Sequence, residues 1–420
     1  MKKCFFTADI LLPDPNKTDL YSWATLACDQ FTSEPKYWED AELAVADKPS
    51  AMRIMLPEVY LSEAEQRIPK INATMEQYLS DVLVCHKDSM IYLEREQSDG
   101  CIRKGIILAV DLECYDYTKG ATSLIRATEA TVAERIPPRV AIRRGASVEM
   151  PHVMLLIDDP QKTVIEPMAN ECDGEIAYDT PLMLGGGRAK ARFLTEHNVD
   201  TVSAALLALA TPEQMEKRYG DRSLAPLLFA VGDGNHSLAS AKAAYEEIKA
   251  NIGKEAASSH PARYALVEIV NIHDDALSFE PIYRVMFGVD TSDVIKKLED
   301  YASNLDGKAS LQELDFITRE SEGKIKIAHP VRQLTVGTLQ EFIDGYLASH
   351  PGSEVDYIHG EDSVRSLIDR PNAIGFMFEG MSKSELFKTV ILDGALPRKT
   401  FSMGHARDKR YYMECRKIIL

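Results

Sequence analysis

The fold is decided around residues 227–245, which read Leu227-Leu-Phe-Ala-Val-Gly-Asp-Gly-Asn-His-Ser-Leu-Ala-Ser-Ala-Lys-Ala-Ala-Tyr245. The five apolar residues that open the stretch predict one buried strand. The following Gly-Asp-Gly-Asn-His cluster is typical of a break in regular structure. Ser237 is a good helix N-cap, and the alanine-rich run 238–250 predicts the helix that it would begin. The stretch therefore predicts a strand, a glycine turn and a helix.

This arrangement is suited to binding an anion. The first amides of a helix lack partners within it, and the macrodipole adds about half a positive charge at that end. Gly232 and Gly234 permit left-handed backbone angles and a close approach of ligand. We interpret Asp233 as a residue that holds Mg²⁺ or takes a proton, and Asn235 and His236 as donors to phosphate oxygens. An ordinary loop is the alternative, because short glycine motifs are weak signals.

Much of the chain resembles the bacterial family called domain of unknown function ten-fifteen. The segments that carry this resemblance are Trp23–Trp38, Ile125–Thr131, Pro151-His152, Gly232–Ser237 and Leu396–His405. Gly232–Ser237 is also similar to the Asp-Gly-His-His-Arg motif of the ParB and sulfiredoxin-like superfamily. Members of that superfamily bind nucleotide phosphates at this turn, and they include free serine kinases. The resemblance implies an α/β or α+β fold, with mixed sheets, helices and a ParB/sulfiredoxin-like nucleotide-binding core.

The chain departs from that motif at two positions. Asn235 stands in place of the first histidine, and Ser237 stands in place of the arginine. Losing the arginine removes a bidentate phosphate donor, so we expect another cation to reach the turn. The candidates from elsewhere in the chain are Arg188, Arg284 and Lys399. Arg188 follows three glycines, in a segment that reads equally well as a hinge or as a lid.

Two groups of carboxylates are candidates for further chemistry. Glu129 lies in the segment Ile125–Thr131, and we expect it to be the general base that takes the proton of an attacking hydroxyl. Asp158 and Asp159 follow an apolar run and could bind a metal, although a plain turn is the commoner role of such a pair. In the N-terminal segment, Asp29 or Glu34 could line a substrate pocket. The alternative there is a wrap over the core, anchored by its two tryptophans.

Composition limits the classes of function. The formal net charge of −17, from 48 basic and 65 acidic residues, argues against a general nucleic-acid binder. No apolar run approaches the length of a membrane span, and the first residues are too few for a signal peptide. Seven scattered cysteines without a Cys-x-x-Cys pair indicate reduced thiols. We expect a cytoplasmic protein that binds neither membrane nor nucleic acid, and the sequence leaves a homo-oligomer open.

At 420 residues, we expect two domains. Residues 1–190 would form an N-terminal α+β domain, and residues 191–420 a C-terminal α/β domain that carries the glycine turn. Strands are predicted at 90–94 and 103–111 with a hairpin at Asp99-Gly100, and a helix is predicted to begin at Ser310. The basic tail from Leu396 to Arg416 either docks on the protein or completes the phosphate pocket through Lys399.

Three functions follow from these residues. The first is a small-molecule kinase that depends on Mg²⁺ and on a nucleotide, ATP or ADP; free serine as its acceptor is implied by the superfamily resemblance alone. In it Asp233, Glu129 and His236 are catalytic, and the amides from Gly234 to Ser237 bind phosphate. The second is a nucleotide-binding switch or scaffold without turnover. The third is a metal-dependent phosphohydrolase, whose ligands would be Asp233, His236 and one of the two aspartates at 158 and 159.

Overall fold

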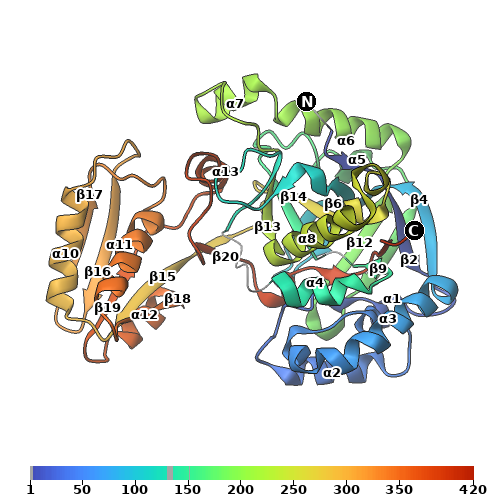
Figure 1. The fold of residues 1–420 in the computed structure, drawn as a ribbon, viewed down its shortest axis with the longest axis horizontal. Helices are drawn as coiled ribbons and strands as arrows, with labels where there is room; N and C mark the ends of the chain where they lie inside the picture. The colour runs from blue at the N-terminus through green and yellow to red at the C-terminus, as the bar shows by residue number, and fades with distance from the viewer. Residues whose placement is uncertain (1–2, 130–135, 151) are drawn as a thin grey trace. The chain divides into compact units, whose positions relative to one another are not determined.

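The computed structural model describes residues 3–129, 136–150 and 152–420, with the backbone alone at Pro138, Ser402 and Met403. These residues form two compact units (Figure 1). Unit 1 contains residues 3–127, 136–150, 152–277 and 404–420, and unit 2 contains residues 128–129 and 278–403. The division expected between residues 190 and 191 falls within strand β12 (Arg188–Phe193) of unit 1.

Unit 1 is built on a ten-stranded mixed sheet in the order β11-β12-β5-β6-β14-β10-β13-β8-β7, with β1 paired to β6. The remaining strands of this sheet are β1 (Phe5–Phe6), β5 (Ile91–Glu96), β6 (Ile102–Asp111), β7 (Tyr115–Asp116), β8 (Ile125–Ala127), β10 (Met154–Ile157), β11 (Ile176–Pro181), β13 (Phe229–Asp233) and β14 (Tyr264–Asn271). Three small ribbons accompany it: β2 (Ala8–Pro13) with β4 (Leu83–Ser89), β3 (Thr25–Leu26) with β21 (Tyr411–Tyr412), and β9 (Val148–Glu149) with β22 (Arg416–Lys417).

The helices of unit 1 differ widely in length. They are α1 (Leu20–Trp23), α2 (Pro35–Val45), α3 (Ala64–Asp81), α4 (Ile136–Arg144), α5 (Met168–Glu171), α6 (Glu196–Leu209), α7 (Pro212–Tyr219), α8 (Asn235–Ile252) and α9 (Lys254–Ala257). Among the described residues, no helix combines the length and the apolar character needed to cross a membrane.

Both faces of the large sheet are buried. Along β6, Ile107 and Ala109 belong to one hydrophobic core, whereas Ile106 and Leu108 belong to a second. The first core includes side chains of the N-terminal helices α1 to α3, and the second includes side chains of α6 and α8. A strand covered on both faces is apolar at consecutive positions, which explains the continuous apolar run of β6.

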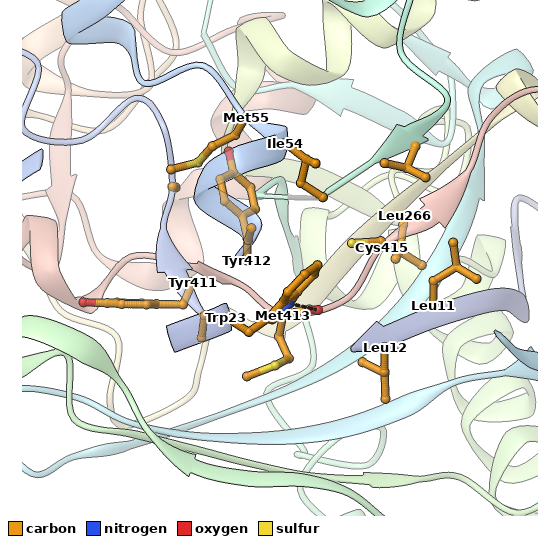
Figure 2. Packing of buried hydrophobic residues seen from close by; sticks show 14 of the residues in the cluster. Leu11, Leu12, Trp23, Ile54, Met55, Leu266, Tyr411, Tyr412, Met413 and Cys415 are labelled. Carbon is orange, nitrogen blue, oxygen red and sulfur yellow. Dashed lines mark hydrogen bonds between the residues drawn. The ribbon is translucent and has the colours of Figure 1, made fainter. Parts of the chain in front are cut away.

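The C-terminal segment 404–420 contributes buried side chains to the first core. Trp23 is fully buried, and its indole N–H donates a hydrogen bond of 2.9 Å to the carbonyl of Met413 (Figure 2). Leu11 and Cys415 exchange two backbone hydrogen bonds, of 2.8 and 2.9 Å. The basic tail therefore docks within its own chain, and the tryptophan-anchored wrap is confirmed.

Unit 2 has a six-stranded sheet in the order β17-β16-β19-β15-β18, with β20 paired to β15. Its strands are β15 (Phe279–Phe287), β16 (Gln312–Thr318), β17 (Glu322–Ile327), β18 (Glu354–His359), β19 (Ala373–Met377) and β20 (Phe401–Met403). Its helices are α10 (Thr291–Ser303), α11 (Thr335–Ser349), α12 (Glu361–Leu367) and α13 (Lys383–Leu392).

The mixed α/β fold class predicted from sequence is confirmed, and so is the hairpin of β5 and β6. The helix predicted to begin at Ser310 is wrong, because this segment forms β16. The glycine-rich segment that reads as a hinge or a lid forms the turn of the β11–β12 hairpin.

Candidate functional site

The predicted strand, turn and helix are present as β13, Gly234 and α8. Phe229, Ala230 and Val231 are fully buried in the sheet, between β10 and β8. The helix begins at Asn235, three residues before the predicted start, because Gly234 takes the N-cap position with a φ of 79°. Ser237 is therefore the third residue of the helix and not its cap.

This earlier start changes what the turn can offer a ligand. Asn235, His236 and Ser237 now form the first turn of an 18-residue helix, and all three are half-buried. Amides in a first turn have no acceptor within their own helix, and they lie at the positive end of its dipole. The first turn of α8 thus has the chemistry of an anion site.

Both glycines of the turn are required by close packing. A Cβ atom at Gly232 would lie 2.8 Å from Cγ of Leu156. A Cβ atom at Gly234 would lie 3.1 Å from Cα of Val153, and a φ of 79° is itself unfavourable for other residues. The two glycines therefore allow the turn to pack closely against Val153 and β10, and this packing alone explains why they are needed.

A cation already lies at this turn. Lys409, from the C-terminal segment, places Nζ 3.0 Å from Oδ2 of Asp233. The other carboxylate oxygen of Asp233 accepts a hydrogen bond of 3.0 Å from the amide of Gly234. Both side chains are mostly buried, with 17% of Lys409 and 25% of Asp233 exposed. The carboxylate is thus oriented by its own turn on one side and by lysine on the other.

A second ionisable pair belongs to the same neighbourhood. His152 precedes β10, whose Met154 is in register with Asp233. Its Nε2 lies 3.7 Å from Oδ2 of Asp29, and its Nδ1 lies 2.8 Å from the hydroxyl of Tyr412. The ring also lies beside Gly234, at 3.3 Å from the position of a Cβ atom there.

The surroundings keep Asp29 ionised. Burial by itself raises the pKa of this carboxyl, but the electrostatic interaction with His152, the hydrogen bond from Gln30 and the charge of Lys409 outweigh it and lower the pKa. Lys409 therefore acts on Asp29 as well as on Asp233. We define Asp29, His152, Asp233 and Lys409, with the first turn of α8, as the polar cluster of unit 1.

The thiol next to this cluster is protonated. Cys28 lies 3.2 Å from the hydroxyl of Tyr412, which donates to its sulfur. Burial, together with the negative charge of Asp29, raises the pKa of Cys28 to about 12. At neutral pH this cysteine is therefore a packing residue and not a nucleophile.

Of the three cations predicted for the turn, Arg188 lies far from it in the same sheet. Arg188 is in β12, five strand spacings or about 24 Å across the sheet from β13, and pairs with Asp179 at 2.7 Å. Arg284 and Lys399 belong to unit 2. Lys399 is exposed, and its Nζ lies 5.1 Å from the ring centre of Tyr357.

Arg284 has a structural role within unit 2. Its side chain is fully buried and donates to the side chain of Gln340 and to the carbonyl oxygens of Ile282, Arg398 and Lys399. Burial lowers its pKa to about 10, which leaves it charged at neutral pH. Arg284 holds the backbone that carries Lys399.

Glu129 also groups with unit 2. It is half-buried, and its backbone forms a parallel bridge with Leu396, whose amide donates to the carbonyl of Thr128 at 2.7 Å. Its role as a general base stays a prediction.

The carboxylates proposed for a hydrolase are at the wrong end of the sheet. Asp158 is four residues beyond Met154, which pairs with Asp233, so it lies about 13 Å along the strand from that aspartate. Asp158 is bound instead by Tyr219, at 2.5 Å, and by His273, at 2.7 Å. Asp159 accepts the amide of Val164 at 2.9 Å. Across the described part of the chain, no group of three or more His, Cys, Asp or Glu side chains is arranged to hold a metal.

Sequence reasoning missed Lys409 and the pairing of Asp29 with His152. Lys409 was one of many cations in a basic tail, with no pattern to separate it from Lys399. Asp29 and His152 each stood in a segment of the family resemblance, and that was the available signal. Their contact with each other depends on the tertiary fold.

Comparison with solved structures finds distant likenesses. "Free serine kinase in complex with AMP" is 9% identical, covers 74% of this chain and 92% of its own, and has a TM-score of 0.37. A conserved hypothetical protein from Pyrococcus furiosus is 9% identical over 74% of this chain and 95% of its own, with a TM-score of 0.34. A C-terminally truncated SbnI from Staphylococcus aureus is 11% identical over 71% and 82%, with a TM-score of 0.33. At these TM-scores the likenesses establish nothing about the site.

Sequence comparison gives a firmer result. No curated protein matches the chain. A family match, in contrast, extends over residues 11–413 and includes the Asp29 loop, His152, the β13–α8 turn and Lys409. The chain belongs to the family described as "Protein of unknown function (DUF1015)".

Proposed function

We propose that the polar cluster of unit 1 binds the phosphates of a nucleotide and transfers a phosphoryl group to a small hydroxyl compound. Free serine is the first acceptor to test, on the strength of the motif resemblance alone. One observation carries the proposal: Asp233 directly precedes the N-cap of α8, Gly234, and Lys409 lies at that carboxylate. An anion site, an acidic group and a cation are thereby combined within unit 1.

Lys409 would supply the charge that the motif lacks. Ser237 stands where the related motif has arginine, so the helix itself contributes no guanidinium at this position. A lysine ammonium binds phosphate as a point charge, without the bidentate geometry of arginine. Nζ of Lys409 is 3.0 Å from Asp233, the residue before the N-cap of α8, and Lys409 is therefore the cation that we propose for a phosphate on the first turn.

Magnesium fits the acidic groups of the cluster. Mg²⁺ in nucleotide sites is usually held by one or two carboxylates together with phosphate oxygens. Asp233 is the predicted ligand, and Asp29 is a second carboxylate under the influence of the same lysine. When bound, the ion would neutralise charge on the phosphates. Asp233 would then bind the ion and lose part of its ion pair with Lys409.

The transfer step needs a base for the acceptor hydroxyl. Glu129 is the base predicted from sequence, and Asp29 is a candidate from the geometry because it is kept ionised beside His152. The proton of the hydroxyl would pass to the carboxylate while the hydroxyl oxygen bonds to the terminal phosphorus. The bond from that phosphorus to the bridging oxygen would break, and ADP would leave if ATP is the donor.

The test is nucleotide binding and turnover in the full chain. Titration calorimetry with ATP and ADP, with and without Mg²⁺, measures binding, and a coupled assay with free serine measures transfer. We expect Asp233→Ala to lower turnover by about 100-fold or more, in the range seen when one electrostatic group is removed from an active site. Asp275→Ala is the matched control, because Asp275 is 93% exposed and pairs with Lys162.

Each outcome has a distinct meaning. Nucleotide binding without transfer to any hydroxyl acceptor would replace the kinase with a nucleotide-binding switch. Metal binding without nucleotide would favour a hydrolase, although Asp158 and Asp159 are not arranged to serve it. Loss of turnover in Glu129→Gln but not in Asp29→Asn would identify Glu129 as the base, and the reverse would identify Asp29. Equal activity of Asp233→Ala and wild type would refute the proposal.

A further inference from the structure

A cavity lies wholly within unit 2, and the nucleotide proposal makes no use of it. Its volume is about 610 Å³, which falls in the range of small-molecule sites. The described residues that line it are Tyr283, Asp315, Phe316, Glu322, Gly323, Lys324, Glu361, Arg365, Met377, Phe378, Glu379 and Gly380.

Strand register explains why these side chains meet. Asp315 of β16 pairs with Met377 of β19 on one side and with Lys324 of β17 on the other. Residues directly opposite in neighbouring strands point to the same face, so these three form a row across the sheet. A Cβ atom at Gly375, two residues before Met377, would touch Val364 of α12. The row therefore lies on the same face of the sheet as α12, and its side chains line the cavity beside that helix.

The floor of the cavity is apolar and aromatic. Tyr283 and Phe378 meet edge to face, with ring centres 5.7 Å apart at an interplanar angle of 80°. Met377 extends the same surface, and each of these three side chains is less than a tenth exposed. A ligand with a hydrocarbon or aromatic body would find contact area here.

The charged lining is unbalanced. It has four carboxylates and two cations, a net charge of −2. Both cations have partners within the lining: Lys324 lies 3.3 Å from Asp315, and Arg365 lies 3.6 Å from Glu322. This leaves Glu361 and Glu379, which form no ion pair within the described parts of the chain.

Glu361, the first residue of α12, lies close enough to Tyr283 to influence the ionisation of its hydroxyl. Burial raises the pKa of the Tyr283 hydroxyl, and the charge of Glu361 and a hydrogen bond to it add to that effect. Glu361 is exposed and is one of the residues that line the cavity. An anionic ligand would be repelled by the two unpaired glutamates, whereas a cation would be attracted by both.

We propose that this cavity binds a small organic cation: a primary amine with an aliphatic or aromatic body. The ammonium group would pair with Glu361 and Glu379, and the body would lie on Tyr283, Met377 and Phe378. Cation–π attraction from the rings would add to the ion pairs. The site is separate from the polar cluster of unit 1 and does not depend on the proposed kinase function.

The probes are phenethylamine and 1,5-diaminopentane, titrated into the full chain by calorimetry without nucleotide. The matched uncharged and anionic probes are 2-phenylethanol and glutarate. We expect the amines to bind with a Kd of about 1 mM or below and both other probes to bind at least about 10-fold more weakly. Raising the salt concentration should weaken amine binding.

Glu361→Gln tests the assignment, because it removes one charge while keeping the shape of the side chain. We expect it to weaken phenethylamine at least about 10-fold, with Glu379→Gln acting in the same direction. Glu354→Gln is the control, as an exposed glutamate of β18 outside the lining. Near-UV circular dichroism checks that each variant is folded. Amine binding that is absent, or unchanged in both Glu361→Gln and Glu379→Gln, would overturn the proposal.

Discussion

Asp29 is the residue whose ionisation is most closely tied to the fold around it. His152, Gln30 and Lys409 together hold its pKa below the usual value of 3.8, against the opposing effect of burial. A carboxyl with a depressed pKa in the folded state stabilises that state above its unfolded pKa. The stabilisation is lost as pH falls through the folded pKa.

We therefore expect Asp29→Asn to lower the free energy of unfolding by about 1 to 2 kcal/mol at pH 7, because hydrogen bonds and ion contacts to a charged group are lost. This difference from wild type should shrink as pH falls below about 3.8 toward the folded pKa, since the wild-type carboxyl then becomes neutral too. Urea unfolding at pH 7, 5, 4 and 3 measures it.

Asp275→Asn is the control at the residue scale, since the exposed Asp275 should show a much smaller difference at every pH. A constant difference between wild type and Asp29→Asn across the whole pH series would show that the role of this side chain is steric and not ionic.

At the scale of elements, the β13–α8 junction depends on one left-handed residue. Gly234 has a φ of 79°, and a Cβ atom there would meet Cα of Val153 at 3.1 Å. Gly220, which ends α7, has a φ of 83° but no atom within 4 Å of such a Cβ. Substitution at Gly220 therefore tests backbone strain alone, whereas substitution at Gly234 tests strain together with steric crowding.

Gly220→Ala should lower the free energy of unfolding by about 1 kcal/mol, through strain alone. Gly234→Ala should lower it by about 2 to 3 kcal/mol, because Val153, which directly precedes β10, must also shift. Urea unfolding of both variants gives the comparison. Equal losses would mean that β10 does not restrain the turn, and that the helix start is set by the backbone alone.

At the scale of the molecule, unit 1 is assembled from both ends of the chain. After unit 2, residues 404–420 return to unit 1 and bring Arg410 into its interior. The guanidinium is 3% exposed, lies 2.7 Å from Glu268 of β14 and also pairs with Glu414. Removing it would leave buried carboxylates short of a partner.

Arg410→Met should therefore destabilise unit 1 by about 3 to 5 kcal/mol, the usual cost of breaking a buried ion pair. Both tryptophans lie in unit 1, so the midpoint of the change in tryptophan emission on unfolding reports this loss. Arg144→Met is the control, because its pair with Glu247 is largely exposed and should be worth less than about 1 kcal/mol. A similar small effect of both changes would show that the C-terminal segment is not an integral part of unit 1.

The features that could be predicted from the sequence are local ones. The apolar run before Gly232, the glycines and the alanine-rich run predict β13, the turn and α8, because each signal acts within a few residues. The β5–β6 hairpin was predictable for the same reason. The exact start of α8 was not, since the preference for Gly234 over Ser237 as N-cap depends on the fit of the turn against Val153. Likewise β16 forms a strand where local preference indicated a helix, because β17 and β19 pair with it.

Which charges share a site depends on the folding of the whole chain. Lys409 reaches Asp233, and Asp29 reaches His152, through contacts between segments far apart in the chain. Arg188 is also basic and follows three glycines, but the strand order places it far across the sheet from Asp233. A single sequence specifies the charge of each side chain, but the distance between charges depends on strand order, register and the return of the C-terminal segment. Electrostatic interactions depend on that distance, which is why the polar cluster became visible only in the folded chain.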